Sequence, residues 1–240
     1  MSEPLRSDLL SAVPHGFFGW CKPSGEAGEF DARQAANRVV AAEQVSPKGR
    51  LATVTQVHSA RTVIVEQPFA PDAAPEADAL VTATPQVLLG IVTADCAPVL
   101  LADVEARVIG AAHAGWRGAH GGVLESCVEA MIECGARRES IAAAIGPTIA
   151  QESYEVDDDF RARFDEVDEA FFRRSREGHW QFDLPHYVAA RLRRAGVFAV
   201  DVTGKNTFAE ADRYYSYRRA SQTGEANDMR QISIIGLPVD

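Results

Sequence analysis

The chain has 240 residues, of which 46% are hydrophobic and 24% are charged, and this composition is typical of a globular protein with one sizeable core. A net charge of −10 without a basic tract argues against nucleic acid as the main partner, because nothing neutralises the phosphates. No apolar run approaches the ~20 residues of a membrane span and no signal sequence is recognisable, so we expect a cytoplasmic protein that binds no membrane.

We predict a single domain over residues 1–240, in which residues 1–13 form a loosely ordered leader and residues 20–30 a loop rich in Gly, Pro and Ser. Apolar runs with turn residues at their ends predict strands at 14–19, 51–57, 62–66, 77–81, 87–93, 98–103, 107–113, 140–145, 197–202 and 232–237. Helical spacing predicts helices at 31–43, 121–134, 156–176 and 184–195. Strands and helices that mix without strict alternation favour an α/β or α+β fold with a mixed sheet.

The helix predicted at 121–134 has the clearest periodicity. Val123, Cys127, Ala130 and Cys134 recur close to every 3.6 residues, and Gly135 supplies the left-handed residue that commonly ends a helix. The two cysteines on this stripe are therefore expected to pack in the core, because a free cysteine behaves as a small hydrophobic residue. With no signal sequence, we expect the cysteines of this chain to be reduced thiols.

Reactive side chains follow the two apolar runs at the centre of the chain. Asp95 and Cys96 come directly after the first run, and His113 ends the second. A Gly-Trp-Arg-Gly turn at 115–118 then offers an arginine and backbone N–H groups. Polar groups at the ends of buried strands point to a functional site more than to a core.

Three good transition-metal donors, His58, Cys96 and His113, lie at the ends of three separate predicted strands. A structural zinc site normally has four ligands with paired spacing, whereas only three are identifiable here. A fourth position open to water or substrate is the arrangement of a catalytic zinc. The alternative is that both imidazoles make ordinary hydrogen bonds and the thiol is simply buried.

Seven short motifs resemble, in order, those of the YfiH family, which has been described as a laccase-domain or polyphenol oxidase family and as purine nucleoside phosphorylase. They are Thr55-Gln-Val-His58, Glu76-Ala-Asp-Ala-Leu-Val-Thr82, Thr93-Ala-Asp-Cys-Ala-Pro-Val99, Ala112-His-Ala-Gly-Trp-Arg-Gly118, Ile145-Gly-Pro147, Tyr154-Glu-Val156 and Tyr215-Ser-Tyr-Arg-Arg219. The resemblance extends from about residue 14 to the end. It implies a sandwich of mixed sheets flanked by helices, with zinc bound by His58, Cys96 and His113.

The resemblance also implies an activity, the phosphorolysis of adenosine, inosine and methylthioadenosine to the base and a pentose 1-phosphate, with adenosine deaminase activity alongside. Phosphorolysis needs an anion site, which Arg117 can supply with help from Arg218 or Arg219. Asp95 is a candidate for proton transfer or for orienting a metal ligand. Trp116 either stacks on the purine or packs the turn.

The chain departs from four motifs of the family pattern. Members usually continue after the first strand with Thr-Arg-x-Gly-Gly-Val-Ser and a later Leu-Asn-Leu, and here residues 19–24 read Gly-Trp-Cys-Lys-Pro-Ser. Asn206-Thr207 stands for a Cys-Thr pair, and residues 223–225 read Thr-Gly-Glu where Thr-Gly-Arg is usual. These changes leave the three expected zinc ligands in place but predict altered nucleoside binding.

Two other classes of enzyme fit the same residues. Copper in place of zinc, with phenols as substrates, is compatible with two histidines and one cysteine, although six histidines without a His-x-His pattern are few for a multicopper oxidase. A metal-free hydrolase would use Cys96 as nucleophile and His113 as base, with Asp95 or another carboxylate. Zinc that only holds the strands together is a third, non-enzymatic reading. No feature of the sequence predicts an oligomeric state.

Overall fold

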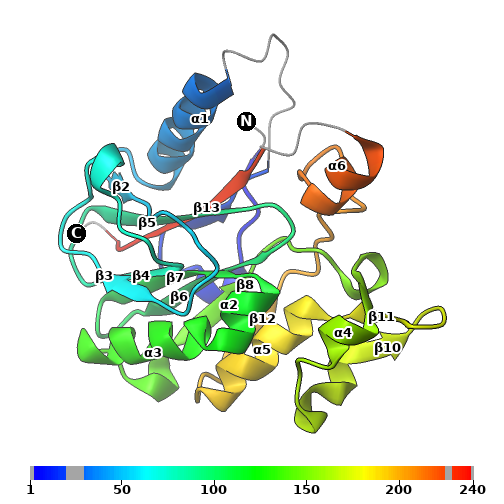
Figure 1. Ribbon diagram of the computed structural model, residues 1–240. Helices are drawn as coiled ribbons and strands as arrows, with labels where there is room; N and C mark the ends of the chain where they lie inside the picture. The colour runs from blue at the N-terminus through cyan, green and yellow to red at the C-terminus, as the bar shows by residue number, and fades with distance from the viewer. Residues whose placement is uncertain (1–2, 20–29, 225–228, 239–240) are drawn as a thin grey trace.

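A computed structural model shows a layered arrangement of two sheets and their helices, and describes residues 3–19, 30–224 and 229–238 (Figure 1). A four-stranded sheet and a six-stranded sheet pack face to face. One helix, α1 (Phe30–Val45), covers the outer face of the smaller sheet, and two helices, α3 (Val123–Glu133) and α5 (Leu184–Arg194), cover that of the larger one. The expected mixed-sheet sandwich flanked by helices is confirmed.

Both large sheets contain parallel and antiparallel neighbours. The smaller has the order β1 (His15–Phe17), β13 (Gln231–Gly236), β5 (Val87–Thr93), β2 (Arg50–Ala52). The larger has the order β12 (Ala199–Val202), β8 (Ala142–Ile145), β6 (Ala97–Asp103), β7 (Val108–Ala114), β4 (Ala79–Thr82), β3 (Thr62–Ile64). A third sheet at one side has the order β10 (Phe172–Arg174), β11 (His179–Phe182), β9 (Glu155–Asp157).

Alternation along the central strands builds the core. In β5, Leu89 and Ile91 face the six-stranded sheet, whereas Leu88 lies against α1. In β6, Leu100 faces the smaller sheet and Leu101 faces the helices. Both faces of these strands are buried, which is why the sequence shows them as continuous apolar runs.

The remaining helices are short. They are α2 (Trp116–Gly121), α4 (Asp158–Arg161) and α6 (Tyr217–Thr223), with 3-10 turns at Asp8–Leu10, Pro71–Ala73, Arg138–Ser140, Gln151–Ser153 and Glu166–Phe171. Among the described residues, none of the helices is both long and apolar enough to cross a membrane.

The prediction of a helix at 156–176 is wrong. This stretch instead forms β9, α4, a 3-10 turn and β10. Phe160, Phe164 and Phe172 pack on one another and on Phe182 of β11, with ring centroids 4.9–6.3 Å apart. Burial of these aromatic rings outweighs the helix propensity of the charged residues between them.

Three smaller differences concern element ends. The helix predicted at 121–134 starts after Gly122, which is left-handed with φ 100°, and residues 116–121 form a separate turn of helix. The strand predicted at 51–57 ends at Ala52. Part of the segment expected to be a loose leader packs instead, since the side chains of Leu10 and Val13 are buried in the core between the sheets. Nearly all of the loop predicted at 20–30, including Cys21, lies outside the described residues.

Candidate metal centre

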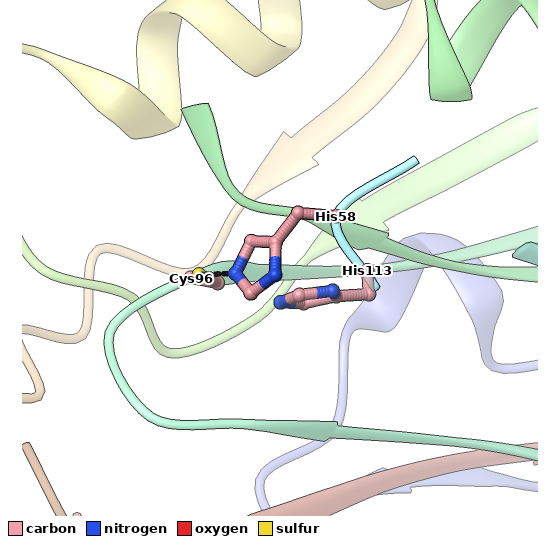
Figure 2. A group of neighbouring side chains, drawn as sticks. All are labelled: His58, Cys96 and His113. Atoms are coloured by element: carbon pink, nitrogen blue, oxygen red, sulfur yellow. Dashed lines mark hydrogen bonds between the residues drawn. The ribbon is translucent and has the colours of Figure 1, made fainter. Parts of the chain in front are cut away.

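His58, Cys96 and His113 converge at one end of the sandwich (Figure 2). Their ligand atoms all lie within 4.8 Å of one another, the two imidazole centroids are 4.7 Å apart, and Cys96 Sγ lies 3.9 Å from His58 Nε2. Strand register explains the approach of two of them. Antiparallel pairing sets Pro98 of β6 opposite His113 of β7, so Cys96, just before β6, reaches the same sheet end. The predicted convergence of the three side chains is confirmed.

Asp78 positions two of the three side chains of the cluster and was not predicted from the sequence. This fully buried carboxylate accepts a hydrogen bond from His113 Nδ1 at 2.8 Å and from the backbone N–H of His58 at 2.9 Å. Its other oxygen accepts from the N–H groups of Val57 and Ser59. With Nδ1 engaged, His113 presents Nε2 to the cluster, and the loop that carries His58 is held with that residue at φ 60°. The sequence feature that could have pointed to Asp78 is its position, as an acidic residue directly before the apolar run 79–81.

Gly115 makes room for the cluster. A Cβ atom at this position would lie 2.8 Å from Cys96 Sγ and 3.1 Å from His58 Cδ2. The glycine of the Gly-Trp-Arg-Gly turn is therefore required for a close approach to two of the ligand side chains.

The cluster favours a charged thiolate. Burial by itself raises the pKa of the Cys96 thiol, but the positive charge of His113 and hydrogen bonds with both histidines outweigh it and lower that pKa to about 6. Burial likewise lowers the pKa of His113, yet the Cys96 thiolate and Asp78 raise it to about 9. Burial raises the pKa of Asp78, and the hydrogen bonds from His113 and Ser59 hold it well below its usual range. A thiolate ready at neutral pH is the form in which cysteine binds metals.

A cavity of about 580 Å³ opens over the cluster. Its wall includes Arg117 and Tyr217, and Tyr217 is 49% exposed. The lining residues are Gln56, His58, Val92, Thr93, Ala94, Cys96, His113, Arg117, Tyr217 and Arg230.

Three expected substrate-binding residues do not line this cavity. Trp116 packs on Phe160 at a centroid distance of 4.8 Å and borders a separate hollow of about 420 Å³, together with Arg218. The guanidinium of Arg219 donates to the carbonyl oxygens of residues 207, 208 and 214, so it holds the chain together. Tyr217, the residue before Arg218, does line the cavity.

Asp95 also lies outside the cavity lining. Its Oδ1 accepts from Thr207 Oγ1 at 2.6 Å, and its Oδ2 accepts from Ser216 Oγ at 3.0 Å and from the N–H of Arg218 at 2.7 Å. The carboxylate that contacts a ligand imidazole is Asp78, not the one adjacent to Cys96 in sequence.

Comparison with known proteins identifies the family. Residues 20–237 match the family model described as multi-copper polyphenol oxidoreductase laccase. The structure is similar to that of the hypothetical protein YfiH of Bacillus licheniformis, with a TM-score of 0.79, 27% identity, and coverage of 93% of this chain and 92% of that one. The chain belongs to the YfiH family. Another similar structure is YlmD from Geobacillus stearothermophilus, with a TM-score of 0.82, 27% identity, and coverage of 97% and 94%.

Curated relatives of this YfiH-family chain carry a functional name. The purine nucleoside phosphorylase of Deinococcus radiodurans is 44% identical over 98% of this chain and 92% of its own length. A purine nucleoside phosphorylase of Rickettsia conorii is 37% identical over 76% of each chain. The family expected from the motifs is thereby confirmed.

Proposed function

We propose that this YfiH-family chain is a zinc-dependent purine nucleoside phosphorylase that acts on adenosine, inosine and methylthioadenosine in the cytoplasm. The observation that carries the proposal is the His/Cys/His cluster at the base of a cavity of about 580 Å³, a size suited to a small-molecule substrate. The name shared by relatives at 36–44% identity supports the same activity.

The donor set fits zinc. Two imidazole nitrogens and one thiolate are ligands that Zn²⁺ prefers, and the second imidazole nitrogen of His113 already donates to a carboxylate, an arrangement common around zinc. His58, Cys96 and His113 would hold the ion, and the cavity leaves its remaining side accessible. Bound zinc supplies a Lewis acid at the base of the cavity.

The reaction breaks the bond between the sugar carbon C1′ and the purine nitrogen, and forms a bond between C1′ and a phosphate oxygen. The electron pair of the broken bond leaves with the purine, which takes up a proton. Arg117, in the cavity wall, places a fixed positive charge where it can hold phosphate. Tyr217 lines the same cavity, where its ring can contact the base.

We include adenosine deaminase as a side activity, in which water replaces the exocyclic amine and inosine and ammonia form. A Lewis-acid site next to a purine pocket supports it, since purine deamination uses the same kind of centre.

Product analysis tests both activities. Zinc-loaded protein is incubated with adenosine, with and without phosphate, and the products are separated by chromatography. Adenine and a pentose 1-phosphate that form only with phosphate support phosphorolysis, and inosine supports deamination. Cys96→Ser, which removes one of the expected zinc ligands, serves as the metal-poor control. If the zinc-loaded protein releases no base, the proposal fails.

A metal-free cysteine hydrolase is a second candidate. It is favoured by the spatial arrangement of Cys96, His113 and Asp78, in which an imidazole lies between a thiolate and a carboxylate. Activity that persists after chelation and disappears on thiol alkylation would support this candidate. Copper-dependent phenol oxidation rests on the description of the family model. In the described part of the chain there is one group of three or more candidate ligands, fewer than a multicopper centre needs.

A further inference from the structure

Asp95 connects the metal centre with the wall of the cavity. It precedes Cys96, and its backbone carbonyl accepts hydrogen bonds from the N–H of Ile149 at 2.9 Å and from Thr148 Oγ1 at 2.7 Å. Its side chain, 8% exposed, accepts from three donors between residues 207 and 218. Asp95 thus ties the turn that carries a ligand to segments more than 50 and more than 110 residues away.

The far partners of Asp95 set the start of α6. Ser216 is the N-cap of this helix, and its Oγ also accepts from the N–H of Arg219. The next residue, Tyr217, lines the cavity, and the N–H of Arg218 donates to Asp95 Oδ2. The same carboxylate therefore fixes the residue before and the residue after the aromatic side chain in the cavity.

The backbone at Asp95 adds a second constraint. Its φ is 80°, in the left-handed region that Gly, Asn and Asp adopt more readily than other residues. Cys96 lies between this residue and the start of β6 at Ala97, and its Sγ is within 4.8 Å of the ligand nitrogens of the two histidines. An alanine at this position would both strain the turn and remove the hydrogen bonds.

We propose that Asp95 is a positioning residue that sets the metal ligand Cys96 and the substrate-facing Tyr217 together, and that it transfers no proton in the reaction. The statement that Asp95 positions Tyr217 for a nucleoside rests on the proposed function. Both carboxylate oxygens already accept hydrogen bonds from buried donors, and the side chain does not line the cavity.

The test compares Asp95→Asn, Asp95→Gly and Asp95→Ala with Asp103→Ala as the matched control. Asp103 is another buried carboxylate that accepts backbone N–H bonds, and it lies at the opposite end of β6. Zinc affinity is measured by competition with a chromophoric chelator, inosine binding without phosphate by calorimetry, and kcat and KM by base release. Thermal unfolding of each variant shows whether it folds.

Asparagine keeps an acceptor for the N–H of Arg218 and tolerates the left-handed backbone, and the Thr207 and Ser216 hydroxyls can reorient around it. We therefore expect Asp95→Asn to keep kcat and zinc affinity within about fivefold of the unsubstituted protein. Asp95→Gly keeps the backbone but loses the hydrogen bonds, so KM, the inosine Kd and the zinc Kd each rise by about tenfold. Asp95→Ala adds the backbone strain and lowers zinc affinity by a further factor of about ten. Asp103→Ala changes neither affinity.

Two results overturn the proposal. A loss of kcat by about a hundredfold or more in Asp95→Asn with its zinc content intact would assign proton transfer to this carboxylate. Unchanged zinc and inosine affinities in Asp95→Gly would show that it positions nothing. If Asp95→Ala does not fold, the Asp95→Asn and Asp95→Gly variants still test the proposal. If the unsubstituted protein releases no base, the proposed function fails, whereas zinc affinity across the variants still tests the positioning of Cys96.

Discussion

Gly115→Ala is expected to damage the metal centre through one added methyl group. The backbone of Gly115 has φ −68° and ψ 164°, which alanine adopts freely, so any effect comes from the side chain. That Cβ would lie 2.8 Å from Cys96 Sγ and 3.1 Å from His58 Cδ2. Non-bonded heavy atoms prefer separations of about 3.5–4.0 Å, so at least one ligand must move by roughly 0.5 to 1 Å.

A displacement of that size exceeds the roughly 0.2 Å tolerance of metal–ligand distances. Perturbing the surroundings of zinc ligands typically costs about 10- to 100-fold in metal affinity, and we expect a loss in that range for Gly115→Ala. The matched control is Gly121→Ala at the end of α2, the short helix that Gly115 caps, where the nearest atom to the new Cβ is 4.0 Å away. Chelator competition measures zinc affinity, and the thiolate-to-metal absorption of the cobalt-substituted protein reports on the Cys96 bond. Zinc affinity equal to that of the control would refute the assigned ligand geometry.

Three further predictions concern the surroundings of the ligands. Asp78→Asn leaves an amide facing backbone N–H groups and weakens the acceptor of a ligand imidazole, so zinc affinity should fall by about 10- to 100-fold in chelator competition. In metal-free protein the Cys96 thiol has a pKa of about 6 and the buried Cys127 thiol a pKa of about 12, so iodoacetamide at pH 7 should modify Cys96 and spare Cys127. Because a lowered pKa keeps the thiolate charged until the pH falls below that value, the alkylation rate at Cys96 should drop only below about pH 6. Zinc should protect it, and peptide mass spectrometry reads out each site; equal labelling of both cysteines would contradict the assignment. Tyr217→Ala should raise the KM for inosine by about tenfold while Trp116→Ala leaves it unchanged, and the reverse order would place the base in the other hollow.

The convergence of His58, Cys96 and His113 was predictable because the evidence for it is local. Each one follows or ends a short apolar run, and antiparallel pairing of β6 with β7 brings Cys96 and His113 to the same sheet end. Gly115, two residues after His113, belongs to the same motif. Continuous apolar runs bounded by turn residues likewise predicted β5, β6 and β7 to within a residue or two.

The residues that support the site were not predictable in the same way. Asp78 contacts His113 across 35 positions, and Asp95 contacts Arg218 across 123, so their roles depend on the folded chain. A sequence does not show whether an arginine faces a ligand or a carbonyl, which is why Arg219 was expected in the site although it bonds three backbone oxygens.

The predicted helix at 156–176 failed for a related reason. Its charged residues favour a helix locally, but the aromatic cluster around Phe160 and Phe164 is completed by Phe182, which lies beyond the segment. Burial against a distant strand decided the conformation.

X-ray absorption spectroscopy at the zinc edge tests the central claim most directly, on protein purified without added metal and then loaded with one equivalent of zinc. The account predicts one sulfur ligand at about 2.3 Å and two imidazole nitrogens at about 2.0–2.1 Å, with the sulfur contribution lost in Cys96→Ser. A first shell of oxygen and nitrogen only, or a sulfur contribution that survives Cys96→Ser, would contradict it.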